Sequence, residues 1–154
     1  MKAILYNKKH LPLKQMLKEA EPPIPKDNEV LIKVYSVSLN AADYRSMNMG
    51  IIPKNKIFES AISGIVEAIG KNIQHFNPGD EIIGDLSDFG FGGLAEFVVA
   101  PEKALVHKPK NVSFENAATL PVASTTALKA LRDKGNIQKG QKVLIVGSSG
   151  GVGI

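Results

Sequence analysis

Residues 142–154 read KVLIVGSSGGVGI and decide the fold class of the chain. Four consecutive apolar residues, 143–146, are typical of a strand buried on both faces of a parallel sheet. A run of glycines follows directly: Gly147, Gly150, Gly151 and Gly153. A strand that runs into such a turn is how a nucleotide-binding βαβ unit begins, with the next helix directing its N-terminus at a pyrophosphate. The spacing differs from the common G-x-G-x-x-G, and a glycine-rich surface turn is the alternative interpretation.

The segments before this motif predict an antiparallel β domain with short helices. Strands are predicted at 2–6, 29–39, 62–69, 81–83, 94–100 and 104–107. Gly64, inside one of them, predicts a bulge or a close backbone approach, and residues 77–80 (NPGD) predict a type II turn. Helices are predicted at 40–47, at 113–118 with Ser113 as N-cap, and at 122–133.

The predicted fold is therefore mainly β, in two parts. Residues 1–120 form one domain, and residues 121–154 contribute a linking helix, the first strand and the glycine loop of an α/β Rossmann domain. A parallel crossover needs about a dozen residues after its first strand, and eight follow Val146. We therefore expect a truncated Rossmann domain, whose apolar strand stays disordered or docks on another copy.

Composition excludes several classes of function. The 154 residues contain no cysteine, which rules out disulfides, thiolate metal sites and cysteine nucleophiles. The net charge of +4 comes from 19 Lys and Arg against 15 Asp and Glu, without a basic block, and favours a solvated face over a nucleic-acid interface. Membrane-length apolar runs and a signal-peptide pattern are absent. We expect a cytoplasmic protein that binds neither nucleic acid nor membrane.

Seven segments follow the order and approximate gaps of one known family. They are 40–45 (NAADYR), 63–70 (SGIVEAIG), 76–82 (FNPGDEI), 93–98 (GLAEFV), 117–121 (AATLP), 125–128 (TTAL) and 140–153 (GQKVLIVGSSGGVG). In these segments the chain resembles the medium-chain dehydrogenase/reductase superfamily and, within it, the zinc-free quinone oxidoreductase (zeta-crystallin-like) branch. The resemblance implies a GroES-like β-barrel domain followed by a Rossmann domain, with the active site between them.

The resemblance also implies a reaction and its partners. The full-length protein would transfer hydride from NADPH to a quinone or to an enone, a small carbonyl substrate, and would form a homo-oligomer. Alcohol dehydrogenases of the superfamily place a cysteine zinc ligand at the position of Asn40, and His75 and His107 lack the paired spacing of a zinc site, so no metal is expected. A non-catalytic GroES-like interaction or structural module is the alternative, although such a module has no use for the glycine loop.

Three candidate catalytic residues are carried over from the resemblance. The amide of Asn40 would donate to the substrate oxygen on which charge develops, or it starts the 41–47 helix through an Asx turn. Tyr44 matches a hydroxyl of the cleft or packs on the barrel. Thr126 matches a residue near the nicotinamide or has an ordinary helical role. For Asp43 we favour capping, or pairing with Arg45, over catalysis.

The candidate cofactor-binding residues are those of the terminal loop: Gly147, Gly150, Gly151, Val152 and Gly153. The isolated chain is expected neither to bind NADPH with useful affinity nor to catalyse the reaction. Two departures from the family pattern stand out. Glu59-Ser60-Ala61 replaces a Gly-x-Asp segment, and Gly147 stands where an alanine is common.

Overall fold

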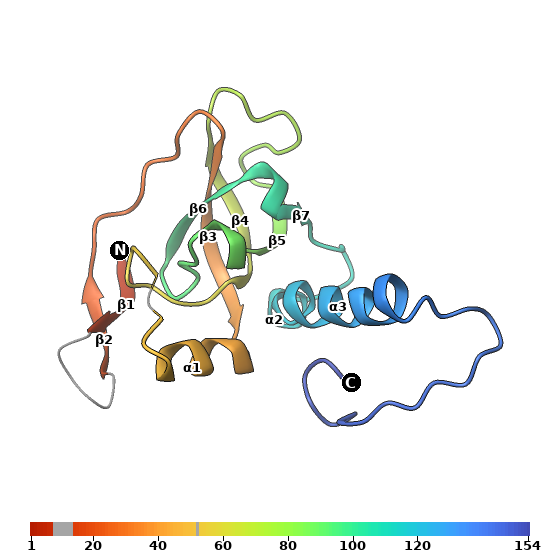
Figure 1. The fold of residues 1–154 in the computed structure, drawn as a ribbon. Coiled ribbons are helices and arrows are strands. Elements are labelled where there is room, and N and C mark those ends of the chain that lie inside the picture. Colours follow the sequence, from red (N-terminus) through yellow and green to blue (C-terminus); the bar gives the residue numbers. More distant parts are fainter. Residues whose placement is uncertain (8–13, 52) are drawn as a thin grey trace.

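The core of the fold is an antiparallel five-stranded sheet (Figure 1). The computed structural model describes residues 1–7, 14–51 and 53–154. In spatial order the strands are β6 (Phe97–Pro101), β3 (Glu29–Ser38), β4 (Ala61–Ile69), β5 (Glu81–Asp85) and β7 (Leu105–His107). These elements match the predicted strands, except that 94–96 lies outside β6. The fold is thus the predicted GroES-like, mainly β architecture.

A separate hairpin lies beside this sheet. It pairs β1 (Lys2–Asn7) with β2 (Lys14–Glu19), and isolated bridges join β1 to Ala95 and to Ile57. The strand β1 was expected from the sequence, whereas β2 was not. Its sequence, KQMLKE, has two adjacent apolar residues between polar ones and no period-2 alternation, so it carries only a weak strand signal.

Apolar side chains that alternate along the strands of the sheet form one core. Its buried members are Val30, Ile32, Ile62, Val66, Phe76, Ile82, Leu86, Val98, Ala100 and Leu105. At its centre Gly64 allows the close backbone approach that the sequence predicted. A Cβ on Gly64 would lie 2.3 Å from the carbonyl oxygen of Lys33, and the β3–β4 register shifts nearby, between Val34 and Ser36. The predicted turn at 77–80 is also present, with Asp80 N donating to Asn77 O at 3.1 Å and Gly79 at φ 96°.

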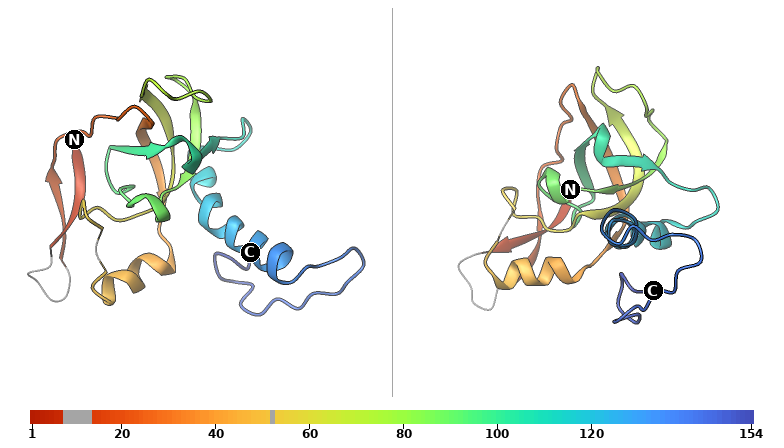
Figure 2. Two further views of the ribbon diagram at one scale, coloured as in Figure 1. Left: turned by 45° about the horizontal axis from the view of Figure 1, so that its top comes forward. Right: turned by 45° about the vertical axis from the view of Figure 1, so that its right-hand side comes forward.

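The helices gather at one end of the sheet and on its β7 side (Figure 2). They are α1 (Ala41–Asn48), α2 (Phe114–Ala118) and α3 (Leu120–Leu128), which continues as a π-helical turn over Lys129–Lys134. Short 3₁₀ turns span Ser87–Phe89 and Glu102–Ala104. Ser113 caps α2 as predicted, accepting from Asn116 N. Pro121 lies in the first turn of α3, where its missing N–H costs nothing.

The α2 helix contacts the sheet through its first residue, Phe114. The Ser63 hydroxyl donates to the carbonyl oxygen of Phe114 at 2.7 Å. The ring of Phe114 stacks on Tyr35, with 4.7 Å between centroids. These two contacts set where α3 leaves the barrel.

Residues 143–146, which have the composition of a buried strand, form no strand in this structure. Residues 135–154 leave the end of α3 as a long loop that turns back on itself (Figure 2), and no strand pairing is recorded within the described tail. Leu144 and Val146 are 88% and 90% exposed. A strand buried on both faces needs neighbouring strands, and here the apolar run has none to pair with.

Candidate functional site

Asn40 begins α1, and its side chain is held in a defined orientation. The residue is extended (φ −117°, ψ 158°) and occupies the N-cap position. Its Nδ2 donates to the carbonyl oxygen of Ser38 at 2.7 Å, and its backbone N–H donates to Asp43 Oδ2, also at 2.7 Å. An amide nitrogen carries two N–H groups, so the bond to Ser38 leaves the second one for a ligand. The helix-starting role and the substrate-donor role are therefore compatible.

Asp43 has the capping role that we favoured over a catalytic one. Its carboxylate, 5% exposed, accepts the Asn40 backbone N–H in the reciprocal half of a capping box. No ion pair joins it to Arg45 among the described residues. The acidic side chain also suits the positive end of the α1 dipole.

Beside Asp43 lies Glu59, which sequence reasoning did not single out as a functional residue. Glu59 is fully buried, and neither of its carboxyl oxygens has a hydrogen-bond donor among the described residues. Its backbone is left-handed (φ 72°), at the position where the resemblance places glycine. That departure, Glu59-Ser60-Ala61, was the only signal in the sequence.

Burial, and to a smaller extent the charge of Asp43 and a hydrogen bond with Asp43, raise the pKa of the Glu59 carboxyl from 4.5 to about 9. The two carboxyl groups thus lie within hydrogen-bonding reach. Two carboxylates only accept, so the contact becomes a hydrogen bond when one group carries a proton. Because the folded pKa lies above the unfolded one, the stabilisation is complete below pH 4.5 and is lost as the pH rises towards 9.

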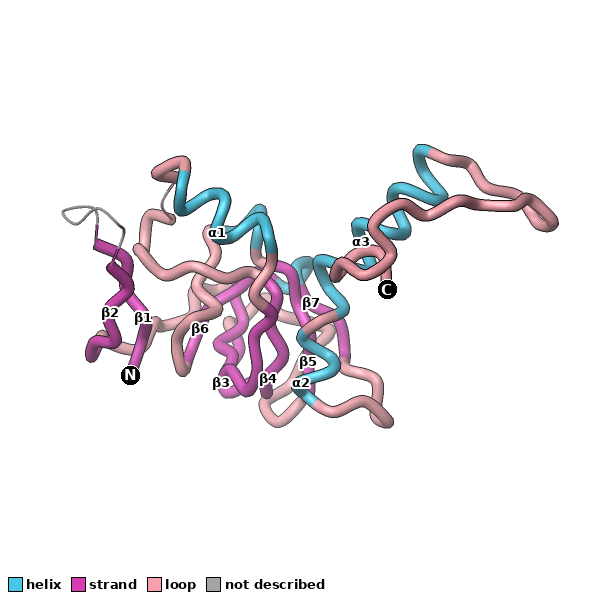
Figure 3. Tube along the Cα trace, turned by 90° about the horizontal axis from the view of Figure 1, so that it is seen from below, coloured by secondary structure: helices cyan, strands magenta, loops and turns pink. Residues whose placement is uncertain are grey.

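The structure brings Asn40 and Tyr44 together on the first turns of α1 but places Thr126 elsewhere. Tyr44 is 54% exposed, and the guanidinium carbon of Arg45 lies 5.9 Å from its ring centroid. Thr126 is exposed on α3, and its hydroxyl donates to Val122 O at 2.7 Å, which is an ordinary helical role. The two helices lie apart when viewed from below (Figure 3).

The terminal glycines form a tight turn. Gly147 has φ 83°, and a Cβ on Gly153 would lie 2.4 Å from the Gly147 carbonyl oxygen. Gly150 O accepts from Gly153 N at 2.8 Å and from Ile154 N at 3.2 Å, the spacing of a first helical turn. Glycine is thus required at two of the positions, while Gly151 has no atom near its Cβ position.

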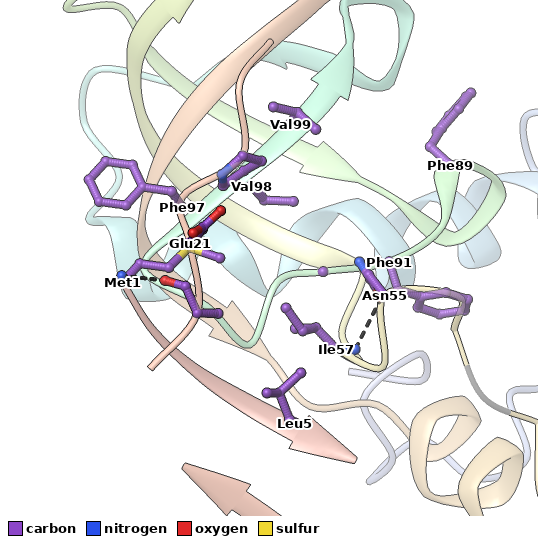
Figure 4. A pocket seen from close by; sticks show the side chains of 13 residues that line it. Met1, Leu5, Glu21, Asn55, Ile57, Phe89, Phe91, Phe97, Val98 and Val99 are labelled. Atoms are coloured by element: carbon purple, nitrogen blue, oxygen red, sulfur yellow. Dashed lines mark hydrogen bonds between the residues drawn. The ribbon is translucent and has the colours of Figure 1, made fainter. Parts of the chain in front are cut away.

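A further apolar cavity of about 370 Å³ lies between β1, the 53–57 loop and β6 (Figure 4). Phe89, Phe91 and Phe97 contribute aromatic rings to its lining, and Asn55 holds the loop by accepting from Ile57 N at 3.0 Å. The lining contains none of the candidate catalytic residues. This cavity is therefore separate from the site around Asn40.

Metal-ligating side chains do not cluster in the part of the chain that the structure describes. No group of three or more His, Asp or Glu there is placed to hold a metal ion. His75 and His107 are near one another only through a 3.3 Å contact of the His107 ring with the His75 carbonyl oxygen. Among the described helices, none combines the length and apolar character needed to cross a bilayer.

Comparison with known proteins gives matches over nearly the whole chain. Residues 26–110 match the family model "Alcohol dehydrogenase GroES-like domain". The chain is 40% identical over 151 residues to the chloroplastic quinone oxidoreductase QR1 of Triphysaria versicolor, covering 89% of this chain and 45% of that protein. It is 38% identical to a chloroplast envelope quinone oxidoreductase homologue of Arabidopsis thaliana, covering 85% and 43%.

Solved structures also match nearly the whole of this chain. The quinone oxidoreductase of Coxiella burnetii superposes with a TM-score of 0.85 at 32% identity, covering 99% of this chain and 50% of that one. The chain thus spans about half the length of the relatives that it matches.

Proposed function

The chain belongs to the alcohol dehydrogenase GroES-like domain family, within the medium-chain dehydrogenase/reductase superfamily, and from this premise we propose that it is the substrate-side half of an NADPH-dependent quinone or enone reductase. The observation that carries the proposal is the similarity to proteins named quinone oxidoreductases over 85–89% of the chain. The structural match to the quinone oxidoreductase of Coxiella burnetii covers 99% of the chain and so includes both the Asn40 helix and the glycine turn. The alternative, a purely structural module, gives no role to the glycine turn.

The proposed role of Asn40 follows from its geometry. Hydride addition to a quinone, or to the alkene carbon of an enone, leaves negative charge on the carbonyl oxygen. A preorganised N–H donor stabilises that charge without reorganising during the reaction. The bond from Nδ2 to Ser38 O and the backbone bond to Asp43 fix the Asn40 amide in advance. Its second N–H is the donor that we assign to the substrate oxygen.

Chain residues could also hold the proposed cofactor. The positive φ of Gly147 and the close contact at Gly153 fit a turn on which backbone N–H groups approach a pyrophosphate. Bound there, NADPH would supply the hydride. Gly150, Gly151 and Val152 complete the turn. The Gly150 N–H donates to the Gly147 carbonyl oxygen at 3.0 Å, so the N–H groups of Gly151 and Val152 are the ones we assign to phosphate oxygens. Thr126 and Tyr44 remain proposed contacts to nicotinamide and substrate.

The proposed reaction is free of zinc on chemical grounds. The chain offers no cysteine, and Asn40 stands where alcohol dehydrogenases of the superfamily have a cysteine ligand. A neutral amide is a poor substitute for a thiolate at a tetrahedral zinc site. We also keep a homo-oligomeric, cytoplasmic protein as a proposal, although two of its relatives carry chloroplast names.

The test is an assay of the complete reductase, in which this chain is joined to its cofactor domain. NADPH oxidation with a simple benzoquinone is measured before and after exhaustive treatment with a chelator. We expect unchanged activity after chelation. Loss of activity that added zinc restores would overturn the metal-free reaction, and absence of quinone and enone reduction would overturn the substrate class.

A further inference from the structure

The buried carboxyl group of Glu59 needs an explanation, because the core offers it no donor. Its side chain is 0% exposed, and neither oxygen finds an N–H or O–H within the described parts of the chain. A buried carboxylate without donors is strongly unfavourable. The group therefore stays neutral and carries its own proton, which needs an acceptor.

Asp43 is the acceptor that the fold supplies. It is 5% exposed, and its carboxyl group lies within hydrogen-bonding reach of Glu59. One of its oxygens already accepts the Asn40 backbone N–H at 2.7 Å. A chain of contacts thus leads from Glu59 through Asp43 to Asn40, the N-cap residue of α1.

We propose that Glu59 is a positioning residue: its protonated carboxyl group donates to Asp43, and this bond fixes the Asn40 amide in the orientation that binds the substrate oxygen. The effect on substrate rests on the function proposed above. The pair formed by protonated Glu59 and ionised Asp43 does not depend on that function. Ionisation of Glu59 would set two buried negative charges against each other and push the start of α1 away.

The surroundings of Glu59 contain no cation that would offset this repulsion in the described structure. No recorded ion pair involves Glu59 or Asp43. The elements packed on Glu59 contribute an apolar or uncharged surface. Gly93 N donates to the Glu59 carbonyl oxygen at 2.8 Å, Ile62 borders the same space, and Tyr6 of β1 contacts the adjacent Phe58 ring. Asp43 is the ionisable group that faces Glu59.

The pair is tested directly by ¹³C NMR of the side-chain carboxyl carbons in this chain across pH 5–10. We expect Glu59 Cδ to titrate near pH 9, with Asp43 Cγ shifting in the same step. In Glu59→Gln, whose amide still donates to Asp43, the Asp43 step near pH 9 disappears. Glu67→Gln, an exposed glutamate on the same strand β4, is the matched control and should leave the step in place. A Glu59 titration below pH 6, or an Asp43 step that survives Glu59→Gln, would overturn the pair.

The link to substrate is tested separately in the complete reductase. Ionisation with a midpoint near pH 9 leaves about one tenth of the enzyme competent at pH 10. We therefore expect KM for quinone to rise about tenfold between pH 8 and 10 in the wild type and to stay flat in Glu59→Gln. A flat wild-type profile, with the NMR step present, overturns the positioning role. An inactive reductase, with the NMR step present, overturns the proposed function and leaves the pair intact.

Asp43→Asn gives a second, independent variant. An asparagine keeps one side-chain oxygen as an acceptor but carries no charge. We expect the Glu59 titration to move to lower pH in this variant, because the largest neighbouring charge is gone. An unchanged Glu59 midpoint would contradict the direct contact between the two carboxyl groups.

Discussion

Replacing Gly64 with alanine tests whether the β3–β4 contact sets the shape of the barrel. The added Cβ would lie 2.3 Å from the Lys33 carbonyl oxygen and 2.9 Å from Ile32 Cγ2. Carbon–oxygen contacts normally stop at about 3.3 Å, so the strands must separate by roughly 1 Å. The obstacle is backbone, which cannot rotate away as a side chain can.

The expected cost follows from the two consequences of that separation. Overpacking in a core costs about 1–3 kcal/mol, and each weakened ladder hydrogen bond adds about 1 kcal/mol. Gly64 pairs with Val34 on one side and Ile82 on the other, so at least one such bond is affected. We expect Gly64→Ala to lower the free energy of unfolding by about 3 kcal/mol, out of a total of roughly 5–15.

The assay is urea unfolding followed by far-ultraviolet circular dichroism, with two matched glycine variants. A loss of about 3 kcal/mol lowers the urea midpoint by roughly 1.5 M for a slope of ~2 kcal/mol/M. In Gly79→Ala the added Cβ meets no atom, but the alanine must adopt φ 96°, so the free energy of unfolding should fall by only about 1–2 kcal/mol. Gly151→Ala meets neither obstacle and should change stability by less than ~0.5 kcal/mol. A Gly64→Ala midpoint equal to that of Gly151→Ala would refute the reasoning.

Three further predictions concern titration, the tail and the cofactor. The free energy of unfolding of the wild type should fall relative to that of Glu59→Gln as the pH rises from about 4.5 to 9. The full pKa shift corresponds to about 6 kcal/mol, and relaxation of the structure around the ionised group should reduce the loss to roughly 3 kcal/mol. Parallel pH profiles of the two proteins in urea titrations would contradict this. Deleting residues 141–154 should leave the unfolding midpoint unchanged but remove concentration-dependent association on size-exclusion chromatography, because the apolar run 143–146 is exposed. Calorimetric titration of the isolated chain with NADPH should show no micromolar binding, and such binding would mean that the glycine turn suffices alone.

Features governed by neighbouring residues could be predicted from the sequence. The turn at 77–80, the Ser113 cap and the start of α1 at Asn40 all depend on contacts within a few positions. The close approach at Gly64 was also expected, because a glycine inside a strand often marks a place where another backbone segment leaves no room for a side chain. The strand partner at that point, Lys33, could not be deduced from the glycine alone.

Features that depend on distant parts of the chain could not be predicted. Glu59 meets Asp43 only because the loop before β4 packs on α1, and the sequence showed merely that glutamate replaces a glycine. The apolar run 143–146 has the composition of a buried strand, yet a strand needs neighbours, and none is recorded here. The separation of Thr126 from Asn40 likewise depends on where α2 docks through Ser63.

The central claim is that Asn40 supplies the donor to the substrate oxygen. Its most direct test is kcat for quinone reduction by Asn40→Ala in the complete reductase, beside Asn48→Ala at the exposed end of the same helix. Loss of one such donor typically lowers kcat by about 10²–10³-fold. We expect that loss in Asn40→Ala with wild-type rates in Asn48→Ala. A kcat for Asn40→Ala within about threefold of the wild type would contradict the account.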